Sequence, residues 1–179
     1  MYFFKIYPIK IHDNIANTVP TAEGALAIAI NETPFTIHNA NCLVLGYGRV
    51  GKVLCHSLSM LGATVSAAAR KFSDFAWIKA NGYTPIHIDD IANLAPKCDI
   101  IFNTIPKLVL GKELLHKIEN RTLIIDLASK PGGVDFDTAK ELGLNVIWAL
   151  SLPGKTAPLT SGRIISESIL NILTEKGVV

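Results

Sequence analysis

The chain has 179 residues, of which 49% are hydrophobic and only 18% are charged, and its formal net charge is +2. This composition excludes an intrinsically disordered protein and leaves no basic excess for binding nucleic acid or an anionic membrane. The three cysteines, Cys42, Cys55 and Cys98, form no CxxC pair, and no segment has the pattern of a membrane span or a secretory signal. We therefore expect a cytoplasmic protein without disulfides, without a metal site and without contacts to nucleic acid or membrane.

The predicted secondary structure begins with an irregular segment at residues 1–17, followed by a helix from residue 18 to about residue 30 with Thr21 as a candidate N-cap. From residue 42 onward, short apolar runs typical of buried strands alternate with segments of helical spacing. The strands are predicted at residues 42–45, 64–69, 85–88, 99–105, 122–128 and 146–149. The helices are predicted at residues 49–61, 72–81, 89–94, 112–118, 135–142 and 157–175, with Asp89 capping the third of them.

This alternation of strands and helices predicts the fold class. It is typical of an α/β fold in which a doubly wound parallel sheet carries helices on both faces. Sheets of this kind bind ligands at the carboxyl ends of their strands, where the winding reverses. We expect one dinucleotide-binding domain over residues 18–179, flanked by an N-terminal and a C-terminal helix and preceded by an arm at residues 1–17.

The loop after the first predicted strand matches the GxGxxG pattern, with Gly46, Tyr47, Gly48, Arg49, Val50 and Gly51. It follows a buried strand and opens a helix, which is the context of a Rossmann-type NAD(P)-binding domain. The first glycine permits the tight turn, the second lets the backbone approach a pyrophosphate at the helix N-terminus, and the third lets the helix pack closely on the strand. The alternative is a tight strand-to-helix turn that binds no ligand.

The end of the second strand bears on the choice between NAD and NADP. An NAD site usually has an acidic residue there, which accepts a hydrogen bond from the ribose 2′-hydroxyl. Here the strand ends with Ala69, Arg70 and Lys71, Ser73 follows, and no carboxylate appears before Asp74. A small residue and two cations suit the 2′-phosphate of NADP. We expect NADP as the cofactor, and the alternative is a solvated loop without a role in binding.

The fourth and fifth strands are expected to end at the same edge of the sheet. The fourth strand ends with Asn103, Thr104, Ile105 and Pro106, which would face the second ribose and the nicotinamide or form an ordinary strand end stopped by proline. The fifth strand ends with Asp126, Leu127 and Ala128. Because Asp126 lies in an apolar run, we expect it to be buried with hydrogen-bond donors from the loop, in a structural role or in catalysis.

Two lysines near this edge are candidates for holding an anionic substrate. Lys130 lies beside a glycine-rich turn, and Lys155 precedes the last predicted helix, where it suits the nicotinamide carboxamide or a substrate anion. A solvated lysine and an ordinary helix start are the respective alternatives. The five histidines have no metal-ligand spacing and no nucleophile signature is present, so the catalytic residues stay unassigned.

Six motifs occur in order along the chain: PTAEGA at residues 20–25, VLGYGRVG at 44–51, AAARK at 67–71, IFNTIP at 101–106, IIDLASKPGG at 124–133 and LPGKTAP at 152–158. On these motifs, residues 18–173 resemble the family formed by the A subunit of dipicolinate synthase from endospore-forming bacteria. The family is more distantly similar to shikimate dehydrogenase and to D-2-hydroxyacid dehydrogenases.

The resemblance implies an NADP-dependent oxidoreductase that acts during sporulation in the mother-cell cytoplasm. A hydroxylated tetrahydrodipicolinate, or its dehydrated form, would lose a hydride to NADP and become dipicolinate. The flavoprotein-like B subunit of dipicolinate synthase would be the partner. Such a small dicarboxylate substrate needs anchors, for which Thr21, Lys130 and Lys155 are the candidates, while Glu23 would orient a lysine or act as a base.

The resemblance also implies a missing part. Family members carry a further N-terminal domain that closes a cleft over the cofactor domain, whereas this chain begins just before PTAEGA. Residues 1–17 would be the remnant of the linking segment, and uncovered apolar faces would favour a homo-oligomer. The rival interpretation is a nucleotide-sensing regulatory module without catalysis, which needs neither the helix before the first strand nor the LPGKTAP segment facing a cleft.

Overall fold

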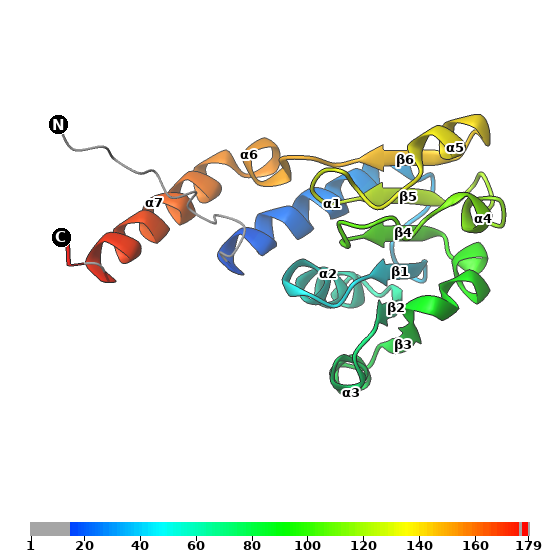
Figure 1. The fold of residues 1–179 in the computed structure, drawn as a ribbon, viewed down its shortest axis with the longest axis horizontal. Helices are drawn as coiled ribbons and strands as arrows, with labels where there is room; N and C mark the ends of the chain where they lie inside the picture. Colours follow the sequence, from blue (N-terminus) through cyan, green and yellow to red (C-terminus); the bar gives the residue numbers. More distant parts are fainter. Residues whose placement is uncertain (1–14, 176, 179) are drawn as a thin grey trace.

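The apolar runs of the sequence form a six-stranded sheet with the order β3-β2-β1-β4-β5-β6 in the computed structural model, which describes residues 15–175 and 177–178 (Figure 1). The strands are β1 (Asn41–Leu45), β2 (Thr64–Ala69), β3 (Thr84–His87), β4 (Ile100–Asn103), β5 (Leu123–Asp126) and β6 (Asn145–Trp148). All neighbouring strands are parallel. Because the winding runs outward from β1 in both directions, the structure confirms the predicted doubly wound α/β fold.

Successive residues of the central strands face opposite layers of the core. In β1, Cys42 and Val44 pack into one hydrophobic cluster, while Leu43 and Leu45 pack into the other. The first cluster is covered by α1 (Thr18–Glu32), α2 (Arg49–Met60), α3 (Phe72–Ala80) and α6 (Leu152–Thr156). The second is covered by η3 (Ile88–Asn93), η4 (Ala95–Lys97), α4 (Lys112–Leu115) and α5 (Phe136–Glu141). Burial on both faces explains why the strands are almost continuously apolar.

The last helix, α7 (Pro158–Glu175), follows α6 and extends away from the sheet (Figure 1). It contacts α6 and the short 3-10 turn η2 (Ile15–Asn17), and it leaves Leu159, Ile169 and Leu170 exposed. Of the helices in the described part of the chain, none combines the length and the apolar character that crossing a membrane requires. The predicted irregular arm falls mostly on residues 1–14, which lie outside the described residues.

Two predicted helix caps are wrong. Helix α1 begins at Thr18 with Asn17 as its N-cap, and the Thr21 hydroxyl donates to the Asn17 carbonyl oxygen at 2.7 Å from within the helix. The helix accommodates Pro20 because a residue in the first turn has no intrahelical acceptor for its N–H. Asp89 lies inside η3, whose cap is His87, because the Asp89 N–H points to His87 Nδ1 at 3.4 Å.

The segment predicted to precede the last helix as a loop is itself a helix, α6. Its first residue, Leu152, is buried against α1 at Gly24, where an added Cβ would lie 3.1 Å from the Leu152 Cβ and 2.6 Å from the Thr156 hydroxyl. This close packing holds α6 beside α1, and α7 starts only after Ala157. A contact between residues far apart in the sequence therefore decides the local structure of this segment.

Candidate nucleotide-binding site

The glycine loop lies at the carboxyl end of β1 and leads into α2. Gly46 has a φ of +97°, which favours glycine, and its N–H donates to the Ala68 carbonyl oxygen of β2 at 2.9 Å. An added Cβ at Gly46 would lie 2.5 Å from Thr104 Oγ1, and one at Gly51 would overlap the Gly46 carbonyl oxygen. The first and third glycines are therefore required by packing within the protein itself.

The second glycine of the loop is different, because its side faces open space. An added Cβ at Gly48 would meet no described atom within 4 Å, and the residue is exposed. Gly48 is also the N-cap of α2, so the unpaired N–H groups of the first helical turn lie beside it. An open approach to a helix N-terminus is the geometry that a pyrophosphate needs. Arg49 is exposed and Val50 is half-buried in that first turn.

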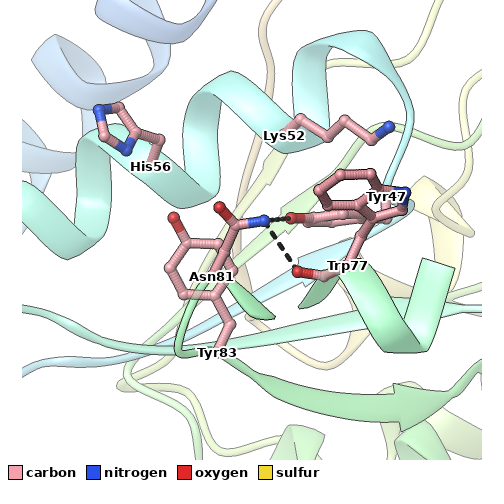
Figure 2. Close-up of a pocket in the computed structure, with 6 residues that line it drawn as sticks. All are labelled: Tyr47, Lys52, His56, Trp77, Asn81 and Tyr83. Carbon is pink, nitrogen blue, oxygen red and sulfur yellow. Dashed lines mark hydrogen bonds between the residues drawn. The ribbon is translucent and has the colours of Figure 1, made fainter. Parts of the chain in front are cut away.

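Tyr47 contributes to the loop through its backbone, whereas its side chain is turned into the protein. Its ring is 6% exposed and packs with the hydrophobic cluster beneath α2 and α3. Asn81 Nδ2 donates to the Tyr47 hydroxyl at 3.3 Å, and the Lys52 amine lies 5.6 Å from the ring centroid (Figure 2). The Tyr47 side chain therefore contacts residues of α2 and of the C-terminal end of α3, and it does not point toward the open side of the glycine loop.

The end of β2 lies next to the glycine loop, because Leu45 of β1 pairs with Ala68 of β2. Ala69 is buried at the end of the strand, and Arg70, Lys71 and Ser73 are exposed just beyond it. Among residues 15–175, neither the Arg70 nor the Lys71 side chain forms an ion pair or a hydrogen bond. Two uncompensated cations beside a glycine loop are suited to a phosphate group.

The ends of β4 and β5 are joined by a buried polar network. Asp126 is fully buried and accepts from three donors: Asn103 Nδ2 at 2.8 Å, the Ala128 N–H at 3.0 Å and the Gly133 N–H at 2.8 Å. Asn103 in turn accepts from the Ile105 N–H at 3.1 Å. Both carboxylate oxygens are satisfied, which a buried charge requires. The contacts of Asp126 therefore support the structural role among the two considered from the sequence.

The turn after β4 is fastened to the glycine loop. Both the hydroxyl and the N–H of Thr104 donate to the Leu45 carbonyl oxygen, at 2.8 and 2.9 Å. Ile105 is half-buried beside Gly46, and Pro106 is exposed at the same edge. The fold thus brings the ends of β1, β2, β4 and β5 together around the open side of Gly48.

Unlike the strand ends, the four candidate substrate residues are not joined to one another by hydrogen bonds in the described part of the chain. Thr21 donates into its own helix, and Glu23, Lys130 and Lys155 are exposed. No hydrogen bond within the described ranges joins any two of them. Lys155 lies in the last turn of α6 rather than in a loop before the final helix. Lys155 still precedes the start of α7 at Pro158, and its role as an anchor stays a prediction.

No cluster of three or more potential metal ligands occurs among the residues that the structure describes. Burial is the main cause that raises the pKa of the three thiols, those of Cys42, Cys55 and Cys98, to about 12 in each case. Thiols with such pKa values stay protonated at neutral pH and are poor nucleophiles and ligands. Their burial in the two clusters fits packing residues.

Sequence reasoning missed a hollow of about 330 Å³ between α2 and α3 (Figure 2). Its lining consists of Tyr47, Lys52, His56, Trp77, Asn81 and Tyr83. A signal was present in the sequence, because Lys52 and His56 on α2 are four residues apart, and so are Trp77 on α3 and Asn81 at the C-cap of that helix. Such spacing places each pair on one side of its helix, but only the fold shows that the two sides face each other.

The chain matches no protein-family model. It is 38% identical over 173 residues to the A subunit of dipicolinate synthase from Bacillus subtilis, an alignment that covers 96% of this chain and 58% of that protein. The crystal structure of the corresponding dipicolinate synthase protein from Bacillus halodurans superposes with a TM-score of 0.89 at 41% identity, over 92% of this chain and 57% of that one. The chain thus spans little more than half the length of these relatives.

A transhydrogenase from Sinorhizobium meliloti superposes with a TM-score of 0.80 over 97% of this chain and 59% of that chain. The sequences are only 18% identical, so this likeness concerns the fold alone.

Proposed function

Because the chain is a homologue of the A subunit of dipicolinate synthase over the part that it spans, we propose that it is the NADP-binding portion of an oxidoreductase of that type. The observation that carries the proposal is the open space at Gly48, beside the N-terminus of α2 and the exposed cations at the end of β2. The residues of this edge fit a dinucleotide, since the first and third glycines close the loop and the second leaves room for a pyrophosphate.

The preference for NADP over NAD rests on the residues after β2. Ala69 leaves space, Arg70 and Lys71 supply positive charge, and the first carboxylate, Asp74, lies in the first turn of α3. A 2′-phosphate would gain charge-assisted hydrogen bonds there, whereas a ribose 2′-hydroxyl would lack its usual acidic acceptor. The backbone at Asn103 to Pro106 and the loop held by Asp126 and Ala128 would border the nicotinamide half.

The proposed reaction takes place in the cytoplasm of a sporulating cell and starts from a hydroxylated tetrahydrodipicolinate, which loses water, or from its dehydrated form. The dehydrated form loses a hydride and a proton and becomes dipicolinate. NADP, when bound, would accept the hydride. The part of this chain is to bind the nucleotide and to orient it through the glycine loop and the turn tied down by Thr104. Lys130 and Lys155, both exposed, are the proposed anchors for the two substrate carboxylates, with Thr21 and Glu23 as further candidates.

Partners are also part of the proposal. The alignment covers only 58% of the Bacillus subtilis protein, so the relatives contain a part that this chain does not match. The proposed partners are a B subunit of dipicolinate synthase and a second copy of the chain. The exposed Leu159 and Leu170 of α7, at 88% and 54% exposure, suit an apolar contact of this kind.

A second candidate is a nucleotide-sensing module that performs no chemistry. The observation that favours it is that no hydrogen bond among the described residues joins any two of the four candidate substrate residues. This module would bind the same nucleotide at the same edge.

Calorimetric titration of the chain with NADP and NAD tests the binding proposal, and NADP should bind more tightly. Turnover of an enzymatically generated hydroxylated tetrahydrodipicolinate, measured in the presence and in the absence of a B subunit homologue, separates the enzyme from the sensing module. NADP binding without turnover under every combination would favour the sensing module. Equal affinity for NAD and NADP would contradict the cofactor preference.

A further inference from the structure

Gly48 does not belong to the lining of the hollow between α2 and α3, although Tyr47 and Lys52 on either side of it do. Lys52 and His56 come from α2, Trp77 from α3, and Asn81 and Tyr83 from the turn that leads into β3 (Figure 2). Tyr83 lies next to the amino end of β3, whereas the nucleotide site is built at the carboxyl ends of the strands. A volume of about 330 Å³ suits a small molecule, since ligand pockets begin at about 300 Å³.

Three of the six residues that line the hollow, Tyr47, Trp77 and Tyr83, carry large aromatic rings. Tyr47 and Tyr83 are 6% and 8% exposed, and they belong to the hydrophobic cluster under the helices. Trp77 is 62% exposed, although it is the largest apolar side chain of α3. Its backbone carbonyl accepts from Asn81 Nδ2 at 2.8 Å, and the same amide group donates to the Tyr47 hydroxyl. Asn81 thus links the Trp77 backbone to the Tyr47 side chain, and aromatic rings such as these are suited to stack on a planar ring.

The polar groups of the hollow favour an anion. Lys52 and His56 lie at its margin, and no carboxylate belongs to its lining (Figure 2). Burial, with a smaller contribution from Cys55, raises the pKa of both Tyr47 and Tyr83, so both phenols are neutral donors at physiological pH. Asp74 is near enough to add to the raised pKa of Tyr47 but does not line the hollow. An ammonium group and phenolic O–H groups are partners that a carboxylate accepts from.

We propose that this hollow is a binding site for a planar aromatic carboxylate, separate from the dinucleotide site. The aromatic rings contact the flat faces of the ligand, and Lys52 binds its carboxylate. The site does not depend on the proposed reaction. If that reaction is correct, its product belongs to this chemical class and would bind here as a regulator, at a site different from the one where it is formed.

Titration calorimetry with dipicolinate as the probe tests the charge requirement, with the neutral diamide of the same ring system as the comparison. Dipicolinate should bind more tightly than the diamide. Lys52→Met should lower the affinity for dipicolinate by about tenfold, which is the loss expected for one hydrogen bond to a charged group. Lys79→Met is the matched control, because Lys79 is an exposed lysine of α3 that does not line the hollow. It should leave the affinity unchanged.

Tryptophan fluorescence tests the location of the site. The chain has two tryptophans, and only Trp77 lines the hollow. Dipicolinate should change the fluorescence of the unmodified chain, and Trp77→Phe should abolish the change, although Trp148 remains. The exposed position of Trp77 makes this variant compatible with the fold. Saturation with NADP should leave the affinity for dipicolinate unchanged.

Several results would overturn the proposal. These are equal affinity for the acid and its diamide, an unchanged affinity in Lys52→Met, a fluorescence change that persists in Trp77→Phe, and displacement of dipicolinate by NADP. The last result would place the probe in the nucleotide site, and it would leave the proposed NADP binding intact. Failure of NADP to bind, with dipicolinate bound normally, would instead contradict the proposed function alone.

Discussion

Arg70→Ala is the variant that most directly tests the proposed recognition of the 2′-phosphate. Arg70 is exposed directly after β2. It lies close to the glycine loop, because the Gly46 N–H donates to the carbonyl oxygen of Ala68, two residues before Arg70. Its side chain has no partner among residues 15–175, so removing it breaks no contact that stabilises the fold. The variant should therefore keep the wild-type melting temperature and change only the binding of the nucleotide.

The size of the effect follows from the exposure of the site. A hydrogen bond to a charged group contributes about 1.5–3 kcal/mol, and solvent around an exposed arginine places this one at the lower end. Since about 1.4 kcal/mol corresponds to a factor of ten in affinity, Arg70→Ala should lower the affinity for NADP by about tenfold. NAD has no 2′-phosphate, so its affinity should stay nearly constant. Salt should reduce the NADP preference of the wild type, because it screens exposed charges.

The assay is calorimetric titration of both nucleotides into the wild type, Arg70→Ala and a control, Arg163→Ala. Arg163 is an exposed arginine of α7, the helix that extends away from the sheet. The control should bind both nucleotides as the wild type does. An equal loss of affinity for NADP and NAD in Arg70→Ala would refute the reasoning, since it would show that Arg70 contacts a part common to both nucleotides.

Three further variants address the loop, the buried network and a helix cap. Gly48→Val should abolish nucleotide binding yet give a normal circular dichroism spectrum, because φ is −80° and the new side chain enters open space; unchanged affinity would contradict the assigned pyrophosphate position. Asp126→Asn should lower the free energy of unfolding in urea by about 1–3 kcal/mol, because its amide cannot accept from both the Ala128 and Gly133 N–H groups; wild-type stability would show that the network contributes nothing. Hydrogen bonds from the N–H and hydroxyl of Thr138 hold the pKa of Asp135 below its ordinary value of 3.8. The ionised Asp135 carboxylate therefore stabilises the folded protein at pH values above 3.8, and this stabilisation is lost as the pH falls below the lowered pKa. The melting temperature of Asp135→Asn should therefore lie below that of the wild type at neutral pH and approach it in acid, and a pH-independent difference would contradict this cause.

The sheet and its edge were predictable because their signals are local. Strands buried on both faces must be apolar throughout, so β1, β4 and β5 stand out in the sequence, and the helices between them require parallel pairing. The placement of the glycine loop between β1 and α2 follows from the same order. Asp126 was predicted to be buried with partners from its loop because a carboxylate in an apolar run needs donors.

The helix starts were less predictable, since several polar residues near each start can serve as the cap. Thr21 has the residue type of an N-cap, but Pro20 fits within the first turn and the helix begins at Thr18. Asp89 likewise has the residue type, but His87 takes the role at η3. In each case the neighbouring turn, rather than the propensity of one residue, decided where the helix begins.

The amino-acid sequence by itself determined the fold class and the glycine loop, because each depends on a periodicity or a motif within a few residues. Only the tertiary structure decided that residues 152–156 form a helix against Gly24 and that an open hollow with aromatic lining lies between α2 and α3. These features depend on contacts between segments that are distant in the chain. Such contacts are set by how the helices pack over the sheet, and no local pattern records them.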